Sequence, residues 1–164
     1  AYTSGATATV TADAITGAGD ATLFSSVNSS GVLYWEGNLH STSIVSGIFS
    51  ISNGTTGDRL YIYQDVTGIL YYSLNLEGEN PYTPTAILTE NTKLAIRYIG
   101  GSTMELWING SMVDSDIIIG SLSAVDRLHL TLYNGSLAPL YGKTKQLAVY
   151  NYLTDLQMQN LTTP

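Results

Sequence analysis

The sequence contains no cysteine, so neither a disulfide framework nor a thiol nucleophile is available to it. Charged residues make up only 12% of the chain, which is about half the usual share. The 6 basic residues are scattered along the sequence, and no basic stripe can neutralise phosphates, so we expect no nucleic-acid partner. No apolar run approaches the roughly 20 residues that a membrane helix needs, so we expect no membrane insertion.

Small polar residues and tyrosines take the place of charges. The 164 residues include 17 Ser and 20 Thr, and there are 12 Tyr against 2 Phe. A tyrosine can bury its ring and keep its hydroxyl in water, so the sequence predicts amphipathic faces. Such faces suit sugar stacking, subunit contacts or simply half-exposed strands. The length and the 44% hydrophobic share fit one domain with its own core.

Strand-like runs separated by turn residues recur about every 8–12 residues, which is the spacing of a β-sandwich. The clearest runs cover residues 31–36, 44–51, 59–64, 68–74, 93–99, 104–108, 127–133 and 146–150. Gly-Gly or Asn-Gly pairs mark several turns, at 53–54, 100–101, 109–110 and 134–135. The sequence therefore predicts an all-β, two-sheet antiparallel β-sandwich of jelly-roll type over residues 21–164, with residues 1–20 as an edge strand or connector.

Alternation along the runs assigns side chains to faces. One set in the hairpin over residues 94–108 is expected in the core: Leu94, Ile96, Tyr98, Met104, Leu106 and Ile108. The opposite side carries Arg97 and Trp107 and is expected to face solvent or a partner. In the run 127–133, the leucines at 128, 130 and 132 are predicted to point inward and His129 to lie on the surface.

One short helix is predicted at the C-terminal end, over residues 155–161. Thr154 and Gln157 have the spacing of a capping box, and Leu153 and Met158 that of a hydrophobic staple. So short a helix needs tertiary contacts, which we expect from Leu156 and Leu161 packing on the sandwich.

Three segments resemble the concanavalin A-like, laminin-G-type sandwich family: LWING at 106–110, LYGKTKQLAVYNYLTDLQMQNLTT at 140–163, and GVLYWEG at 31–37 with FSISNGTTGDRLYIY at 49–63. The third is similar to the opening strands of a subgroup found in bacteriophage tail fibres and other virion surface proteins. The resemblance implies a two-sheet jelly roll whose relatives bind glycans or proteins. Calcium-dependent relatives place paired Asp/Asn ligands in rim loops, and no such pair is matched in this sequence. We therefore predict no cofactor, with Ca²⁺ as an alternative that has no matched ligand set.

The sequence contains no convincing catalytic constellation. Glu77 and Glu79 have the spacing of glycosidase carboxylates but lie in a turn-like Leu-Glu-Gly-Glu-Asn-Pro segment. Asp114 and Asp116 are more simply explained as a solvated acidic loop than as a divalent-ion site. No motif surrounds His40 that would make it the base of a triad. The sequence thus predicts a protein that is not an enzyme.

Aromatic side chains with polar neighbours are the candidates for binding, because sugars offer apolar C–H faces to rings and hydroxyls to polar groups. The predicted ligand- or interface-binding residues are Trp107, Tyr34, Tyr61, Tyr63, Arg59 and Tyr133. For Trp107, the alternative is packing against the C-terminal segment. Trp35, next to Tyr34, is expected in the core.

The leading hypothesis is a non-catalytic recognition module, extracellular or on a virion surface, that binds a carbohydrate or host receptor as part of a phage fibre. The alternative is a structural module whose partners are its own copies, in a trimer or filament, or neighbouring virion proteins. In that case its outward aromatic side chains would form the assembly contacts.

Overall fold

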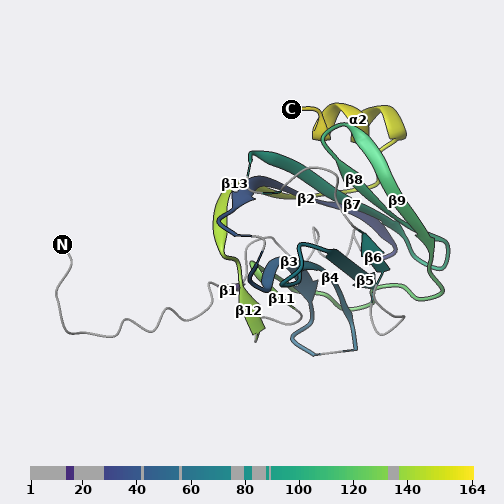
Figure 1. Ribbon diagram of the computed structural model, residues 1–164. Helices are drawn as coiled ribbons and strands as arrows, with labels where there is room; N and C mark the ends of the chain where they lie inside the picture. The colour runs from purple at the N-terminus through teal and green to yellow at the C-terminus, as the bar shows by residue number, and fades with distance from the viewer. Residues whose placement is uncertain are drawn as a thin grey trace.

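The computed structural model describes residues 14–16, 28–41, 43–55, 57–74, 80–82, 88, 90–132 and 137–164. In this part of the chain, two antiparallel sheets lie face to face, and one helix lies on the outside of one of them (Figure 1). The predicted class, a two-sheet antiparallel jelly-roll sandwich with one short C-terminal helix, is confirmed.

The strands of the described residues fall into two large sheets and one small pair. The six-stranded sheet has the spatial order β1 (Ala14–Thr16), β10 (Arg127–His129), β3 (Ser46–Ser52), β4 (Arg59–Gln64), β5 (Leu70–Leu74) and β6 (Asn80–Tyr82). The five-stranded sheet has the order β13 (Gly142–Tyr150), β2 (Ser30–Leu39), β7 (Thr92–Ile99), β8 (Thr103–Ile108) and β9 (Ser111–Ile117). The pair consists of β11 (Thr131–Leu132) and β12 (Leu137–Pro139) and lies against β3. In the region 1–20, β1 is thus an edge strand beside β10.

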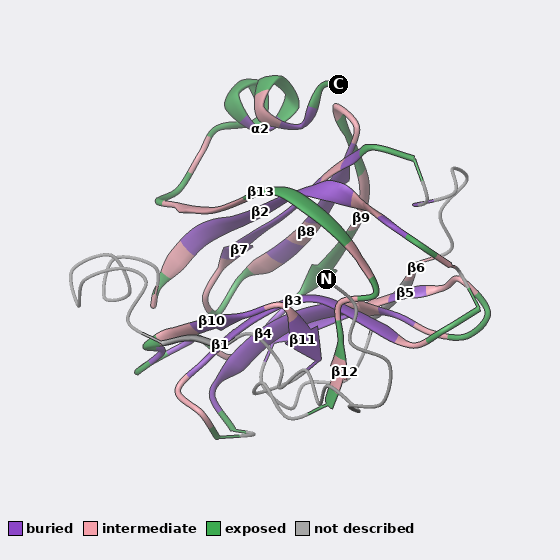
Figure 2. Cartoon of the chain, turned by 90° about the vertical axis from the view of Figure 1, so that its left-hand side faces the viewer, coloured by how far each residue is buried: buried purple, intermediate pink, exposed green. Residues whose placement is uncertain are grey.

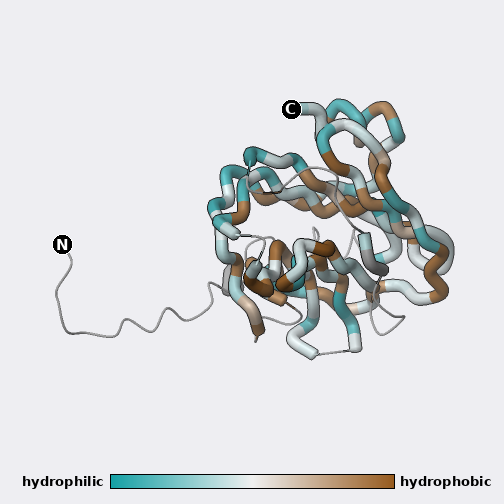
Figure 3. Tube along the Cα trace, in the orientation of Figure 1, coloured by the Kyte–Doolittle hydropathy of each residue, from teal (hydrophilic) through white to brown (hydrophobic). Residues whose placement is uncertain are grey.

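Aliphatic side chains and a few rings fill the space between the two large sheets. Figure 3 shows hydrophobic and hydrophilic positions alternating along many of the strands, as expected where one face of a strand is core. All six residues that alternation assigns to the core in the β7–β8 hairpin belong to this buried cluster. Trp35 also belongs to it, whereas Tyr34 and Trp107 belong to a second cluster on the other side of the five-stranded sheet.

The turn between β8 and β9 is built by Asn109 and Gly110. Both have positive φ, 47° and 86° respectively, as a two-residue hairpin of type I′ requires. The Asn109 Oδ1 also accepts a hydrogen bond of 2.9 Å from the backbone N–H of Lys93. The chain therefore turns back at Asn109-Gly110 and continues as β9, which we had predicted to be a solvated acidic loop. That prediction is wrong, because residues 111–117 pair with β8 at the edge of the sheet.

The predicted strand over residues 127–133 is broken at Leu130. β10 pairs with β3 in the six-stranded sheet, and β11 leaves that sheet to pair with β12. Leu128 lies in the core, and Leu130 packs against it. The surface position predicted for His129 is wrong, because only 4% of this residue is exposed. The backbone of β11 crosses directly over Gly47, where there is no side chain to keep the two strands apart.

Helix α2 (Asp155–Thr162) begins with the predicted capping box. The Thr154 hydroxyl accepts from the backbone N–H of Gln157, and the Gln157 side chain accepts from the backbone N–H of Thr154. Met158 and Thr162, one turn apart, face the five-stranded sheet, and Leu161 packs beside them. Leu156 is 66% exposed, so the packing that we expected of it is wrong. Among the residues described here, no helix is long and apolar enough to span a membrane.

The crossing at Gly47 yields a prediction about stability. A Cβ at this position would collide with the backbone of Thr131 and Leu132, so Gly47→Ala is expected to lower the free energy of unfolding by about 1–3 kcal/mol. The matched control is Gly57→Ala, because a Cβ there would have nothing within 4 Å. Urea denaturation of both variants measures the effect. Equal midpoints for Gly47→Ala and the wild type would contradict the close crossing.

Candidate functional site

Trp107 and Tyr34 lie on the outer face of the five-stranded sheet but are not exposed. Their exposed fractions are 6% and 2%, and both rings belong to one buried cluster with Met158 of α2. Figure 2 shows the helix above the buried strands, with the exposed side of the helix turned away from them. The exposure expected of these two rings is wrong, and the alternative for Trp107, packing against the C-terminal segment, is what the structure has.

Arg97 joins α2 to this face of the sheet. Its Nε and Nη2 atoms donate to the two carboxylate oxygens of Glu105, each at 2.9 Å. Nη1 donates to the carbonyl of Leu153 at 2.8 Å, and Nη2 also donates to Asp155 at 2.6 Å. The Trp107 indole N–H donates to Glu105 at 2.9 Å. Because these charged and polar groups are paired within the chain, this face is a structural contact rather than a candidate binding site.

Arg59, Tyr61 and Tyr63 share the outer face of the six-stranded sheet, as alternation along β4 predicts. The Arg59 guanidinium lies 5.0 Å from the centroid of the Tyr61 ring. The Tyr61 and Tyr63 rings stack at 6.2 Å, and Tyr63 stacks on Tyr71 of β5 at 5.2 Å. We call these four side chains the tyrosine ladder. Arg59 and Tyr61 are buried, whereas Tyr63 and Tyr71 are partly exposed.

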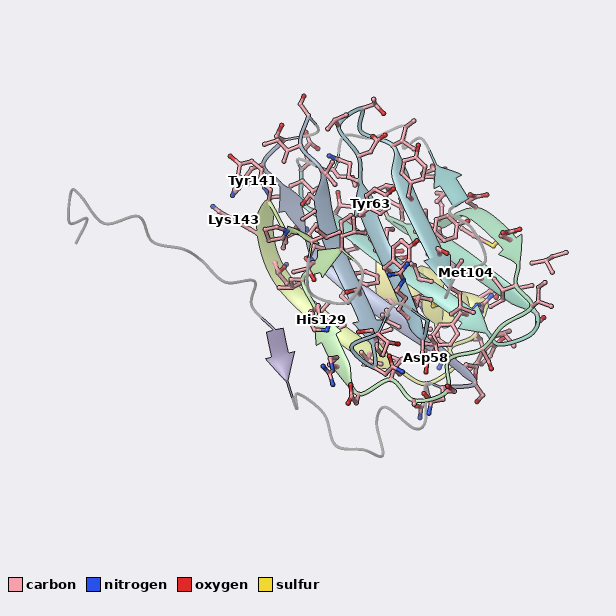
Figure 4. The ribbon with its side chains drawn as sticks, turned by 90° about the horizontal axis from the view of Figure 1, so that it is seen from below. Asp58, Tyr63, Met104, His129, Tyr141 and Lys143 are labelled. Carbon is pink, nitrogen blue, oxygen red and sulfur yellow. The ribbon has the colours of Figure 1, made fainter. Side chains whose placement is uncertain are left out.

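A row of polar side chains crosses the same face. Strand register places His129 beside Ser50, Ser50 beside Tyr61, and Tyr61 beside Ser73. His129, Ser50 and Ser73 are at most 4% exposed, and neither hydroxyl nor either imidazole nitrogen has a hydrogen-bond partner. We call these three residues the polar row. Figure 4 views this side of the molecule and labels His129 and Tyr63.

The polar row is chemically unusual because buried polar groups are nearly always hydrogen-bonded. Each buried donor or acceptor without a partner costs about 1–3 kcal/mol. Because the three residues are at most 4% exposed, this cost falls on the folded chain itself, at the outer face of the six-stranded sheet.

Two arginines lie on this face on either side of Ser52. Register pairs Ser52 with Arg59 on one side and with Arg127 on the other. The Arg127 side chain is 36% exposed, and its Nε and Nη2 donate to the neighbouring Asp126 at 2.7 and 3.2 Å. In a chain of net charge −7 with only 6 basic residues, two guanidinium groups on one face create a local preference for an anionic group.

Sequence reasoning found Arg59, Tyr61 and Tyr63 but missed Tyr71 and the polar row. Alternation could have placed Ser50 and Ser73 opposite the core, since their neighbours along β3 and β5 are core residues. It could not have brought these serines together with His129, because that depends on which strands pair and in which register. Tyr133 lies outside the described residues.

The acidic candidates do not form a catalytic pair in the described part of the chain. Glu77 and Glu79 lie outside it. Glu36, which is 4% exposed, accepts hydrogen bonds from Lys145 at 2.6 Å, Asn91 at 3.1 Å and the Tyr34 hydroxyl at 3.2 Å. The Lys145 bond foremost holds the pKa of Glu36 below its usual value, so this carboxylate is poorly suited to donate a proton. No three His, Asp or Glu side chains within the described ranges gather closely enough to hold a metal ion.

Comparison with solved structures finds the same fold at low sequence identity. The CBM40 of the Ruminococcus gnavus IT-sialidase, bound to α2,3-sialyllactose, is 17% identical with a TM-score of 0.70, and 92% of each chain is covered. The Limulus polyphemus SAP-like pentraxin is 14% identical with a TM-score of 0.61, covering 80% of this chain and 68% of that one. Domains LG4–5 of the mouse laminin α1 chain are 13% identical with a TM-score of 0.60, covering 79% and 38%.

These structures share the jelly-roll sandwich with this chain. No protein-family model matches the sequence. No curated protein matches it either. The likeness is therefore one of fold, and the chemistry of the site must be argued from its own residues.

Burial of His129 predicts a pH dependence of stability. Burial, and secondarily the charge of Arg127, lower the pKa of this imidazole below its ordinary 6.5. Below this value the unfolded chain takes up a proton that the folded chain does not yet bind, so stability is full above it and falls as the pH falls. The loss attributable to His129 between about pH 7.5 and about pH 5.5 is at most about 1.4 kcal/mol.

The measurement is urea denaturation at both pH values. His129→Gln is expected to lose less stability than the wild type over this interval, because its side chain does not titrate. The matched control is His40→Gln, at the chain's other histidine, which is exposed on the surface. An identical pH dependence in His129→Gln and the wild type would show that the imidazole is not desolvated.

Proposed function

We propose that this chain is a non-catalytic recognition module that binds a glycan on the outer face of its six-stranded sheet. The observation that carries the proposal is the pair of stacked, partly exposed rings of Tyr63 and Tyr71 on this face. The polar row of His129, Ser50 and Ser73 lies buried without hydrogen-bond partners beside Tyr61. Pairing within the chain accounts for the other outer face, through Arg97 and α2. Among the described residues, the outer face of the six-stranded sheet carries polar groups that lack such pairing, at Ser50, Ser73 and His129.

The chemistry of the face suits a sugar. Sugar hydroxyls can donate to and accept from the serine hydroxyls and the imidazole nitrogens. The partly exposed rings of Tyr63 and Tyr71 offer apolar surface to the C–H face of a pyranose. The half-exposed guanidinium of Arg127 on the same face adds a preference for a carboxylate.

We therefore propose an acidic glycan as the ligand class. Two structural neighbours support this choice, because the CBM40 of the Ruminococcus gnavus IT-sialidase is bound to α2,3-sialyllactose in one structure and to α2,6-sialyllactose in another. Arg127, beside Ser52 and with its side chain 36% exposed, is the feature of this chain that would receive the carboxylate.

The setting that we propose is extracellular, on a virion surface, with the chain forming part of a phage fibre that binds a host receptor. The support is the resemblance of residues 31–37 and 49–63 to the opening strands of tail-fibre modules. A fibre presents many copies at once, so a weak individual site would still give strong attachment through multivalency.

Binding of α2,3- and α2,6-sialyllactose, measured by isothermal titration calorimetry, tests the proposal. Lactose, which lacks the carboxylate, is expected to bind about tenfold more weakly or worse, the equivalent of about 1.4 kcal/mol. Arg127→Gln and Tyr63→Ala are expected to weaken sialyllactose binding by at least about the same factor. The matched control is Tyr152→Ala, because Tyr152 also lies beside an arginine, Arg97, at 5.4 Å.

Three results would count against the proposal. Equal binding of lactose and sialyllactose would contradict an acidic ligand. Equal losses of affinity in Tyr152→Ala and Tyr63→Ala would contradict the location of the site. Absence of binding to every glycan of an array, with the chain displayed at high avidity, would contradict glycan recognition altogether.

The alternative function is assembly with other copies or with neighbouring virion proteins. It is favoured by large hydrophobic side chains that the chain leaves exposed, among them Val66 at 57%, Leu137 at 53% and Leu156 at 66%. Trp107 and Tyr61 no longer support it, because both are buried within a single chain. A concentration-independent trimer or filament mass in solution, together with no glycan binding, would favour assembly over recognition.

A further inference from the structure

β9 is the last strand of the five-stranded sheet, and no described strand pairs with its outer side. The strand is exposed along most of its length (Figure 2). Ile117 at its end and Ile119 just beyond are 81% and 89% exposed. An open edge next to exposed β-branched residues is a ready template for pairing with another chain.

Two aspartates occupy the positions of β9 where core residues would be expected. Register pairs Asp114 with Leu106 and Asp116 with Met104, and both partners belong to the core between the sheets. Because side chains of paired residues lie on the same face, both carboxylates extend the inner face of the sheet past its last apolar strand. The Tyr72 hydroxyl, on the facing sheet, donates to Asp114 Oδ2 at 2.9 Å.

The same carboxylates also engage the backbone of the edge. The N–H of Ser115 donates to Asp114 Oδ1 at 3.0 Å, and the N–H of Ile117 donates to Asp116 Oδ1 at 2.8 Å. The N–H of Ile118 points the other way, since it donates to the carbonyl of Ser102 beside β8 at 3.0 Å. Successive N–H groups alternate in direction along a strand, so those of Ser115 and Ile117 face the open side.

We propose that Asp114 and Asp116 guard the β9 edge and prevent a second copy of this chain from extending the five-stranded sheet. Two effects contribute. Each carboxylate accepts a hydrogen bond from an outward N–H that an added strand would need. The two negative charges also repel the same two charges on an approaching β9. The wild-type chain therefore does not join its copies through this edge, whatever other surfaces it uses.

The opposite edge of the same sheet has a comparable protection. β13 carries a bulge between Thr144 and Gln146, opposite β2. Lys143 within its first half is exposed, and the Lys145 side chain is 69% exposed at the bulge. Bulges and lysines are established means of keeping edge strands unpaired. Both edges of this sheet thus carry residues that oppose its extension.

Cross-linking at a single engineered cysteine tests the proposal, and the absence of native cysteine makes it specific. Ser115→Cys places one thiol at the middle of β9, where two antiparallel edges would bring two thiols together. Adding Asp114→Ser and Asp116→Ser is expected to raise the yield of disulfide-linked dimer under mild oxidation by about tenfold or more, because the like-charge repulsion is gone. The change to asparagine at both positions retains the acceptor oxygens and is expected to give an intermediate yield.

Three controls separate edge pairing from other causes. Glu90→Ser with Asp126→Ser, in the Ser115→Cys chain, removes the same charge at exposed positions away from β9 and should leave the yield unchanged. Tyr72→Phe removes the hydrogen bond to Asp114 without touching the edge, and should also leave it unchanged. In cysteine-free chains, Asp114→Ser with Asp116→Ser should raise the solution mass above that of the wild type, and a further Ser115→Lys should restore the wild-type mass.

The proposal is overturned if Asp114→Ser with Asp116→Ser gives no more cross-linked dimer than Ser115→Cys alone. It is also overturned if Glu90→Ser with Asp126→Ser raises the yield of dimer equally. It is also overturned if Ser115→Lys fails to restore the mass, since association would then come from loss of folding rather than from the edge. Near-ultraviolet circular dichroism of each variant reports whether the sandwich is intact.

Discussion

Each of the two large sheets buries side chains on both of its faces, and this double burial constrains everything else in the molecule. The inner faces are apolar and need only to fit each other. The outer faces carry arginine, glutamate, histidine and serine, and those groups lose water when they are covered. A covered polar group is stable only when it finds another partner. The difference between the two outer faces is whether that partner lies within the chain.

On the outer face of the five-stranded sheet, the partners lie within the chain. The Arg97 guanidinium is bonded to Glu105 and to the N-terminal end of α2, so the helix is held by its first turn as well as by Met158. On the six-stranded sheet, the hydroxyls of Ser50 and Ser73 and the imidazole of His129 have no such partner. A face of this kind is expected to be less stable than its counterpart. The same fold thus pairs the polar groups of one outer face within the chain and leaves several described polar groups of the other without a partner.

The edges of the five-stranded sheet follow the same reasoning. Backbone groups at an edge also need partners, and water or a neighbouring side chain can supply them as well as a second chain can. In β9 the aspartate carboxylates accept hydrogen bonds from the edge N–H groups. In β13 a bulge and two lysines disrupt the pairing surface.

Local rules predicted the strands, the Asn109-Gly110 turn, the capping box at Thr154 and the inner faces, because period-two alternation and nearby hydrogen bonds involve residues close in the sequence. The same rules failed for Trp107, His129 and Asp114, because what covers a face, which strands pair and where a sheet ends are decided by contacts between distant segments. The sequence by itself determined which side of each strand is apolar. Only the tertiary structure decided which described polar side chains are paired internally and which are buried without a partner, since that depends on the register of β10, β3, β4 and β5 and on the place where α2 docks.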